Sequence, residues 1–194
     1  MLRPVLTARA RRFPLAENSS SRIRWTALGI GIVLVAFIAV MAAASDEQLV
    51  VTNRVLGNPV PDVSGETLDG GTYDIADAQA EGRWTIVNFF ATWCAGCVNE
   101  HPELVAFEQW GQQTGRAEIV AVVFNDPVEE VEAFFAANGG GWPVLDNPAL
   151  PVEFQVSQIP ETFVVNPSGR VVDHLQGEVR ADYLISVIEG RFNP

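Results

Sequence analysis

The sequence predicts an α/β domain built on one mixed β-sheet with helices on both faces, and three observations lead to this prediction. Apolar strands alternate with amphipathic helices through the middle of the chain, which is typical of parallel strands joined by helices. An antiparallel hairpin is expected near the end, where residues 162–165 and 170–175 flank an Asn-Pro-Ser-Gly turn. Cys94 and Cys97 form a Cys-x-x-Cys pair where a buried strand gives way to a helix.

The first expected elements are two extended segments, one around Val63 and one over residues 73–75. They form an N-terminal β-hairpin, because Asp69-Gly70 between extended segments favours a tight turn. Residues 84–90 are a continuous apolar run, as expected of a central strand buried on both faces. The remaining elements are a helix over 94–112, a strand over 118–124, a helix over 127–137, short segments over 142–145 and 150–154, and a closing helix over 181–188.

The N-terminal part of the chain predicts a membrane anchor. Six arginines and one acidic residue lie in the first 24 residues, and residues 25–45 carry no charge. An uncharged run of this length matches the ~20 residues that a helix needs to cross a bilayer, and arginine-rich tails stay cytoplasmic. We therefore expect a cytoplasmic tail over 1–24, a transmembrane helix over 25–45, a linker over 46–57 and an extracytoplasmic domain over 58–194. A signal peptide cleaved after Ala42-Ala43-Ala44 is the alternative, and it also exports the domain.

The exported part of the chain is strongly acidic. Residues 46–194 contain six arginines, no lysine and 23 acidic residues, which gives a formal charge of −17. Such a domain repels nucleic acid and attracts basic partners. An exported protein held together by disulfides would contain several cysteines, whereas this chain has two in one motif. The pair is therefore expected to act as a redox-active disulfide that needs no further cofactor.

The position of the two cysteines predicts different roles for them. The sulfur of Cys94 is expected over the free amides of a helix N-terminus, which stabilise a thiolate. Cys97 lies one helical turn further on, within reach of a disulfide, and is expected to be the more buried, resolving thiol. A zinc site is the competing interpretation, but it would need His101 and His174 as ligands, and His101 is poorly placed on the same helix. Both histidines are expected to be surface or packing residues.

These motifs together resemble the thioredoxin superfamily and, within it, the membrane-anchored TlpA/ResA/DsbE-type proteins. The similarity covers about residues 58–192 and rests on Pro61-Asp62, Leu68-Asp69-Gly70 and residues 87–97, 100–102, 159–163 and 166–169. It implies a thioredoxin-like fold and thiol–disulfide exchange outside the cytoplasm. Asn88 stands where general thioredoxins carry a buried aspartate, as in the anchored branch. Gly96 departs from the proline that most relatives have between the cysteines.

The resemblance also implies roles for residues around the dithiol. Pro160 is expected to form a cis peptide bond, so that Ile159 offers its amide and carbonyl to an extended substrate strand. Trp93 is expected to shield Cys94 beside the substrate groove, with plain core packing as the alternative. Glu161 is expected to border the same groove and read substrate charge, unless it is merely solvated.

Two polar residues are expected to support the cysteines. Glu100 lies one turn beyond Cys97, where a carboxylate can exchange a proton with the resolving thiol. The alternative for Glu100 is an ordinary exposed helix glutamate. Asn88 is expected to satisfy buried polar groups near the dithiol.

The resemblance of Pro160-Glu161-Thr162 to the branch that serves cytochrome c maturation implies a client. The expected function is reduction of the Cys-x-x-Cys-His disulfide of apocytochrome c or of other exported thiol proteins. A membrane thiol reductase would supply the electrons, and the haem-attachment machinery is a further expected partner. The alternatives are a disulfide-forming oxidase and a non-enzymatic apocytochrome holdase. A peroxiredoxin is disfavoured, because the expected upstream proline is missing and a second cysteine follows Cys94 closely.

The arginine asymmetry gives a testable prediction of topology. A reporter fused after Pro194 is expected to report export and to fractionate with membranes. Reporter activity and labelling from outside the cell measure export, and cell fractionation measures membrane association. An exported but freely soluble reporter would support cleavage after the alanine run, and a cytoplasmic reporter would contradict the predicted compartment.

Overall fold

The computed structural model describes residues 25, 28–31, 33, 35 and 54–191. The chain divides into two compact units, Met1–Val51 and Thr52–Pro194. The expected tail, most of the expected anchor and most of the expected linker lie outside the described residues. Within the part that is described, no helix combines the length and the apolar character needed to span a membrane.

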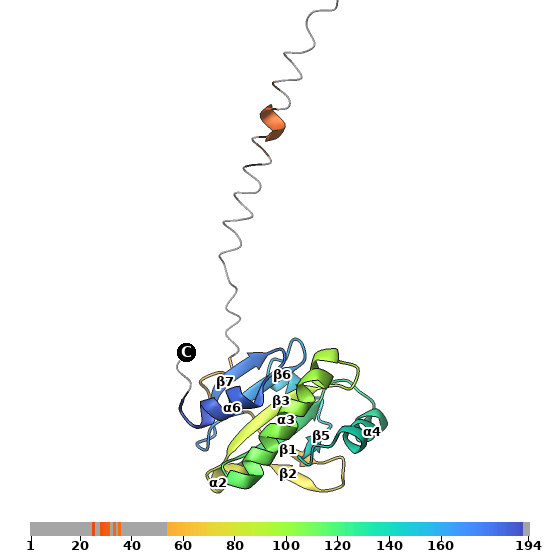
Figure 1. Cartoon of the computed structure of the whole chain (residues 1–194), viewed down its shortest axis with the longest axis vertical. Coiled ribbons are helices and arrows are strands. Elements are labelled where there is room, and N and C mark those ends of the chain that lie inside the picture. Colours follow the sequence, from red (N-terminus) through yellow and green to blue (C-terminus); the bar gives the residue numbers. More distant parts are fainter. Residues whose placement is uncertain (1–24, 26–27, 32, 34, 36–53, 192–194) are drawn as a thin grey trace, which may run out of the picture. The chain divides into compact units, whose positions relative to one another are not determined.

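The second unit is built on a five-stranded mixed sheet, as predicted (Figure 1). Its strands are β3 (Trp84–Phe90), β4 (Ala117–Val123), β5 (Val144–Leu145), β6 (Glu161–Val165) and β7 (Val171–Gln176). Their order across the sheet is β5-β4-β3-β6-β7, with β3, β4 and β5 parallel and β6 and β7 antiparallel to their neighbours. Strand β3 is therefore central, and its C-terminal end leads directly into the cysteine motif.

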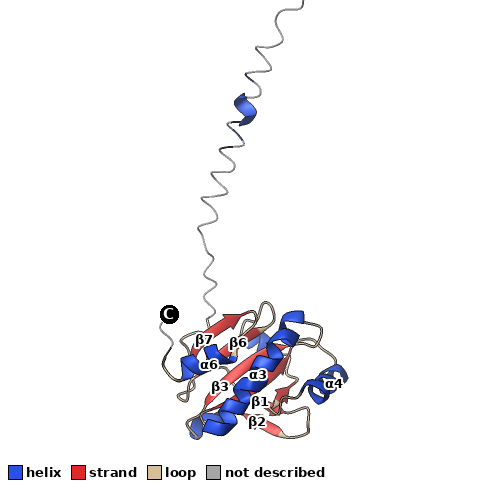
Figure 2. Cartoon of the chain, in the orientation of Figure 1, coloured by secondary structure: helices blue, strands red, loops and turns tan. Residues whose placement is uncertain are grey.

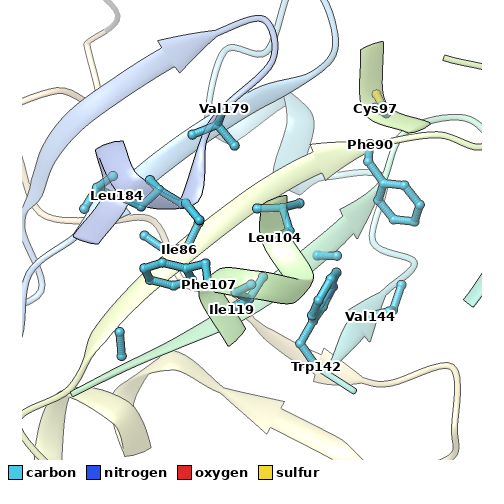
Figure 3. Close-up of a cluster of buried hydrophobic side chains, with 14 of the residues drawn as sticks. Ile86, Phe90, Cys97, Leu104, Phe107, Ile119, Trp142, Val144, Val179 and Leu184 are labelled. Carbon is cyan, nitrogen blue, oxygen red and sulfur yellow. The ribbon is translucent and has the colours of Figure 1, made fainter. Parts of the chain in front are cut away.

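Strand β3 alternates between two hydrophobic cores because successive side chains point to opposite faces of a sheet. Ile86 and Phe90 belong to one core, and Val87 and Phe89 belong to the other. The first core also holds side chains from the helices α3 (Ala95–Thr114), α4 (Val128–Asn138) and α6 (Ala181–Ile188). Figure 3 shows this core, in which Leu104 and Phe107 of α3 and Leu184 of α6 lie around Ile86 of β3. Figure 2 shows α3 and α6 lying across the strands.

Helix α3 packs very closely on the start of β4. A Cβ atom on Gly111 would lie 2.5 Å from the main-chain oxygen of Ala117, so only glycine fits at this contact. The helix ends at Gly115, which adopts a left-handed conformation with φ 65° and caps the last turn. These two glycines allow a 20-residue helix to turn directly into β4 while its first turn stays at the end of β3.

The expected N-terminal hairpin is present as β1 (Ser64–Glu66) paired with β2 (Thr72–Asp74). One element was not predicted: α2 (Ile75–Ala80), which begins where the sequence had suggested a continuing strand. Asp74 ends β2 and caps α2, since its carboxylate accepts a hydrogen bond from the Ala76 amide at 2.8 Å. The short helix α5 (Leu150–Glu153) and the helix α6 agree with the expected segments.

The folded domain begins earlier than the expected boundary at residue 58. Val55 is only 6% exposed and belongs to the second core, and the Gly57 amide donates to the Val171 carbonyl at 2.8 Å. The last residues of the expected linker therefore pack onto β7. The sequence did not show this because the two apolar residues Val55 and Leu56 are too short a run to reveal a strand or helix period.

Candidate active site

Cys94 and Cys97 form a disulfide at the start of α3. Cys94 is the N-cap residue of the helix, and its sulfur accepts a hydrogen bond from the Cys97 amide at 3.2 Å. This contact confirms that the first sulfur lies at the free amides of a helix N-terminus, where a thiolate is stabilised. Cys94 is 8% exposed and Cys97 is 4% exposed. The expectation of an exposed Cys94 was therefore too strong, because the disulfide holds its sulfur against the first helical turn.

Glu100 is fully buried, so the alternative of an exposed helix glutamate is wrong. It lies on α3 one turn beyond Cys97, and its side chain is 1% exposed. One carboxylate oxygen accepts from the Asn88 amide group at 2.8 Å, and the other accepts from the Val179 main-chain amide at 2.9 Å. Asn88 also donates to the Thr162 hydroxyl at 3.0 Å. Asn88 thus satisfies buried polar groups behind the dithiol, as expected.

Burial raises the pKa of Glu100 to about 7, because desolvation penalises the charged carboxylate. The hydrogen bonds from Val179 and Asn88 act in the opposite direction, and the nearby charge of Glu178 adds to the rise. A carboxylate whose pKa is near neutral pH is well matched to accepting and returning a proton. Its place on the same helix face as Cys97, one turn away, makes that thiol the expected proton partner.

The loop that faces the cysteines is residues 155–160, called here the proline loop. The Ile159–Pro160 peptide bond is cis, as the resemblance implied. A Cβ atom built on Gly96 would lie 3.1 Å from Cδ of Pro160, so the loop sits directly against the first turn of α3. Ile159 is half-buried, and its main-chain amide and carbonyl form no hydrogen bond within residues 54–191. They are free to pair with an extended substrate segment.

Two expected substrate contacts need correction or refinement. Glu161 is 0% exposed, so it cannot read substrate charge directly. It is the first residue of β6, and donors from the proline loop and from β7 enclose its carboxylate. Trp93 is 60% exposed, which excludes core packing, and its indole N–H donates to the Asn125 carbonyl at 3.2 Å. Its ring is available beside the cysteines as a substrate surface.

Neither histidine lies free beside the cysteines. The ring of His101 is buried against Phe134, Phe135 and Trp142, and its Nε2 lies 2.9 Å from the Gly139 carbonyl oxygen. His174 stacks on Phe163 and bonds Glu161. Within the described residues, no group of three or more His, Cys, Asp or Glu side chains is arranged to hold a metal ion.

A cavity of about 590 Å³ opens next to Trp93, beyond the end of β4. Its lining includes Phe124, Asn125, Asp126, Asp146 and Val152. Asn125 accepts the indole N–H of Trp93, and Asp126 accepts the Thr92 amide, so this lining is connected to the cysteine motif. The cavity combines apolar walls with two carboxylates, which suits a basic or mixed segment of a substrate protein.

Residues 56–174 match the model of the AhpC/TSA family, which is more than half of the chain. The chain belongs to the AhpC/TSA family. It is 32% identical over 137 residues to the thiol:disulfide interchange protein HelX of Rhodobacter capsulatus, covering 69% of this chain and 74% of HelX. It is 31% identical over 124 residues to the thiol-disulfide oxidoreductase ResA of Bacillus subtilis, covering 62% of this chain and 67% of ResA.

Solved structures agree with these relatives. A thioredoxin-family thiol:disulfide interchange protein from Chlorobium tepidum superposes with a TM-score of 0.62 at 29% identity, covering 68% of this chain and 94% of the other. The fold is therefore thioredoxin-like, and this member of the AhpC/TSA family is a thiol–disulfide oxidoreductase of the DsbE/ResA type with a disulfide-bonded Cys-x-x-Cys pair, Cys94 and Cys97.

Sequence reasoning missed several contacts of this oxidoreductase. It did not pair Glu161 with His174, and it did not place Val179 or Asp126 near the cysteine motif. All these contacts join segments far apart in the chain, so no local pattern reveals them. The exposed acid at Glu178, which accepts from Asn99 at 3.1 Å, was likewise without a sequence signal.

The asymmetry of the cysteines leads to a prediction about their roles. Cys94→Ser is expected to abolish exchange, whereas Cys97→Ser is expected to leave a stalled mixed disulfide with a substrate protein. Non-reducing electrophoresis and mass spectrometry detect the trapped species. Alkylation of the reduced enzyme at mildly acidic pH is expected to modify Cys94 first, and preferential modification of Cys97 would reverse the assignment.

The raised pKa of Glu100 leads to a second prediction. Glu100→Gln is expected to slow the step that Cys97 performs and to remove an ionisation with a pKa of about 7 from its pH profile. Glu103→Gln is the matched control, because Glu103 lies on the same helix and accepts one main-chain hydrogen bond, from Ala181. Stopped-flow rates across pH measure the effect, and identical profiles for the two variants would contradict it.

The same substitution is expected to change the pH dependence of stability. The folded state holds the Glu100 proton more tightly than the unfolded state, so the wild type loses stability as the pH rises from about 4.5 to about 7. Glu100→Gln lacks this loss, which is on the order of 3 kcal/mol at ~1.4 kcal/mol per pKa unit. Urea unfolding at several pH values measures it.

Proposed function

We propose that this oxidoreductase is anchored in the cell membrane and reduces the Cys-x-x-Cys-His disulfide of apocytochrome c outside the cytoplasm. The observation that carries the proposal is the buried carboxylate of Glu100 behind a cysteine pair whose intervening residues, Ala95 and Gly96, carry no charge. A nearby negative charge disfavours a thiolate, and no cation between the cysteines stabilises one. Both features favour the disulfide form of the enzyme and hence a reducing couple.

The reaction proceeds in two exchanges. The Cys94 thiolate attacks one sulfur of the client disulfide, which forms a mixed disulfide and releases the other client sulfur as a thiolate that takes up a proton. Cys97 loses its proton, with Glu100 as the acceptor, and its thiolate attacks the sulfur of Cys94. This step closes the Cys94–Cys97 disulfide and releases the second client sulfur as a thiolate, which takes up the proton held by Glu100. The client gains two electrons from the enzyme and two protons, one from Cys97 by way of Glu100 and one from solvent.

A further cycle requires two electrons from a membrane thiol reductase, which would reduce the Cys94–Cys97 disulfide by the same chemistry. An anchor over residues 25–45 with a cytoplasmic arginine-rich tail would hold the domain near such a donor. The haem-attachment machinery, which takes up the reduced client, is the proposed partner downstream.

Charge supports a basic client segment. The exported part of the chain has a formal charge of −17, and the cavity beside Trp93 carries the carboxylates of Asp126 and Asp146. Complementary charge raises the rate of encounter and fixes orientation. The exposed indole of Trp93 and the free main-chain groups of Ile159 would contact the same segment from either side of Cys94.

The proposal predicts a reducing potential and a matching activity. The Cys94–Cys97 couple is expected to lie at about −200 mV or below, and the purified domain to reduce an oxidised Cys-x-x-Cys-His peptide. Equilibration with glutathione measures the potential, and mass spectrometry follows the peptide. A peptide of the same sequence with acidic flanks serves as the control and is expected to react more slowly.

Two outcomes would contradict the proposal. A potential near about −120 mV would make the protein a disulfide-forming enzyme for exported proteins. Tight binding of the reduced peptide without any thiol turnover would identify an apocytochrome holdase instead.

A further inference from the structure

A second buried glutamate lies beneath the proline loop. Glu161 is 0% exposed and accepts hydrogen bonds from the main-chain amides of Ser157 at 3.2 Å and Gln158 at 3.3 Å. On its other side, His174 Nε2 lies 3.0 Å from its carboxylate and Gln176 donates at 3.2 Å. One carboxylate therefore joins two consecutive amides of the proline loop to two side chains of β7.

An isolated buried carboxylate costs several kcal/mol, so its partners must compensate for the lost hydration. Desolvation acts to raise the pKa of Glu161, but the bonds from His174, Ser157 and Gln176 outweigh it and lower the pKa below the ordinary value. Glu161 is therefore ionised at neutral pH. The stacking of His174 on Phe163, with ring centres 4.3 Å apart and planes 8° apart, fixes the donor on β7.

The contacts of Glu161 decide which main-chain groups of the proline loop remain free. The amides of Ser157 and Gln158 are occupied by the carboxylate, and the carbonyl of Pro160 accepts from the Gly177 amide at 2.9 Å. Ile159, between them, keeps both its amide and its carbonyl unbonded within residues 54–191. The amides of Gln155 and Val156 are also bonded, to Val152 and Pro151, and proline has no N–H, so a substrate strand finds one free main-chain donor in residues 155–160, the amide of Ile159, with the carbonyl of the same residue as an acceptor beside it.

We propose that Glu161 is a positioning residue that sets the register of the client strand on the proline loop. By occupying the two amides before Ile159, it leaves the Ile159 amide as the one free main-chain donor of residues 155–160 and holds that residue against the first turn of α3. Pro160 and Gly96 meet there, since the Cβ position of Gly96 lies 3.1 Å from Cδ of Pro160. The client disulfide is thereby aligned with Cys94. This inference rests on the proposed function only in that the client is a peptide disulfide.

The experiment compares Glu161→Ala and Glu161→Gln with wild type and with Glu118→Ala as the control. Glu118 lies on β4 of the same sheet, and its truncation also removes two interactions, those with Tyr73 and Arg83. It has no hydrogen bond to the proline loop. Each variant is assayed with an oxidised Cys-x-x-Cys-His peptide and with a small disulfide that makes no strand contact. Hydrogen exchange of the Ser157 and Gln158 amides reports the loop directly.

Glu161→Ala is expected to raise KM for the peptide about tenfold, with kcat changed by less than about twofold and the rate with the small disulfide unchanged. The Ser157 and Gln158 amides are expected to exchange at least about tenfold faster. Glu161→Gln is expected to lie near wild type in both measurements, because its amide oxygen still accepts from the loop. Glu118→Ala is expected to leave KM and both amides unchanged.

An unchanged KM in a folded Glu161→Ala protein with fast loop exchange would overturn the proposal. Equal losses of kcat/KM with the peptide and with the small disulfide would also overturn it, because they would indicate that Glu161 has a merely structural role. If Glu161→Ala does not fold, Gln176→Leu is tested instead, because it removes one hydrogen-bond donor to Glu161. This variant is expected to raise KM for the peptide by a smaller factor. An unchanged KM would count against the proposal. If the Cys-x-x-Cys-His peptide is not a substrate, any other peptide disulfide supports the same KM comparison, so failure of the proposed client is distinguishable.

Discussion

The buried Glu100 carboxylate imposes the constraint on which the arrangement of the active site depends. A charged group taken from water must be satisfied by hydrogen bonds, and Glu100 finds its donors on two separate segments. Asn88 comes from β3, Val179 comes from the segment before α6, and Glu100 itself lies on α3. These three parts of the fold meet behind Cys97. The hydrogen bonds that compensate for burying the carboxylate therefore also hold α3, which carries both cysteines, in place relative to the sheet.

Glu100 and Glu161 show how the surroundings of a buried carboxylate decide its chemistry. Both side chains are at most 1% exposed and both accept main-chain hydrogen bonds. At Glu100 desolvation is the larger effect and raises the pKa to about 7. At Glu161 the additional donors, which include His174 and Gln176, outweigh desolvation and lower the pKa. One group is thereby suited to exchange protons, and the other is suited to hold a loop in place.

Gly96 has a steric consequence that complements these electrostatic ones. It lies in the first turn of α3, where the helix meets the proline loop. A side chain at this position would come within 3.1 Å of Pro160 and within 3.6 Å of Glu178. Its absence lets the loop, with the free main-chain groups of Ile159, lie slightly closer to the first turn of α3 than a Cβ atom would allow. The loop that Glu161 contacts and the helix turn that carries the disulfide therefore meet directly at this point.

Much of the fold was readable in the sequence because its signals are local. The apolar run of β3, the Cys-x-x-Cys at the following helix and the apolar periodicity of α6 each lie within a short window. The expected segment 181–188 coincides with α6, and the mixed sheet follows from the order of the elements. The short helix α2 was missed, because three residues of strand precede it without a break and its cap, Asp74, also belongs to that strand.

The sequence by itself determined the reactive pair, its place at a helix N-terminus and the alternation that builds the sheet, because each depends on neighbouring residues. Only the tertiary structure decided which charged residues are buried. Glu100 and Glu161 are both glutamates near the motifs, and nothing local distinguishes a solvated side chain from one enclosed by distant donors. The partners of Glu161 on β7 and of Glu100 at Val179 lie 13 to 79 residues away along the chain. Burial of a charged side chain depends on how distant segments pack together, and the packing of β7 and the proline loop around β6 placed Glu161 beneath that loop.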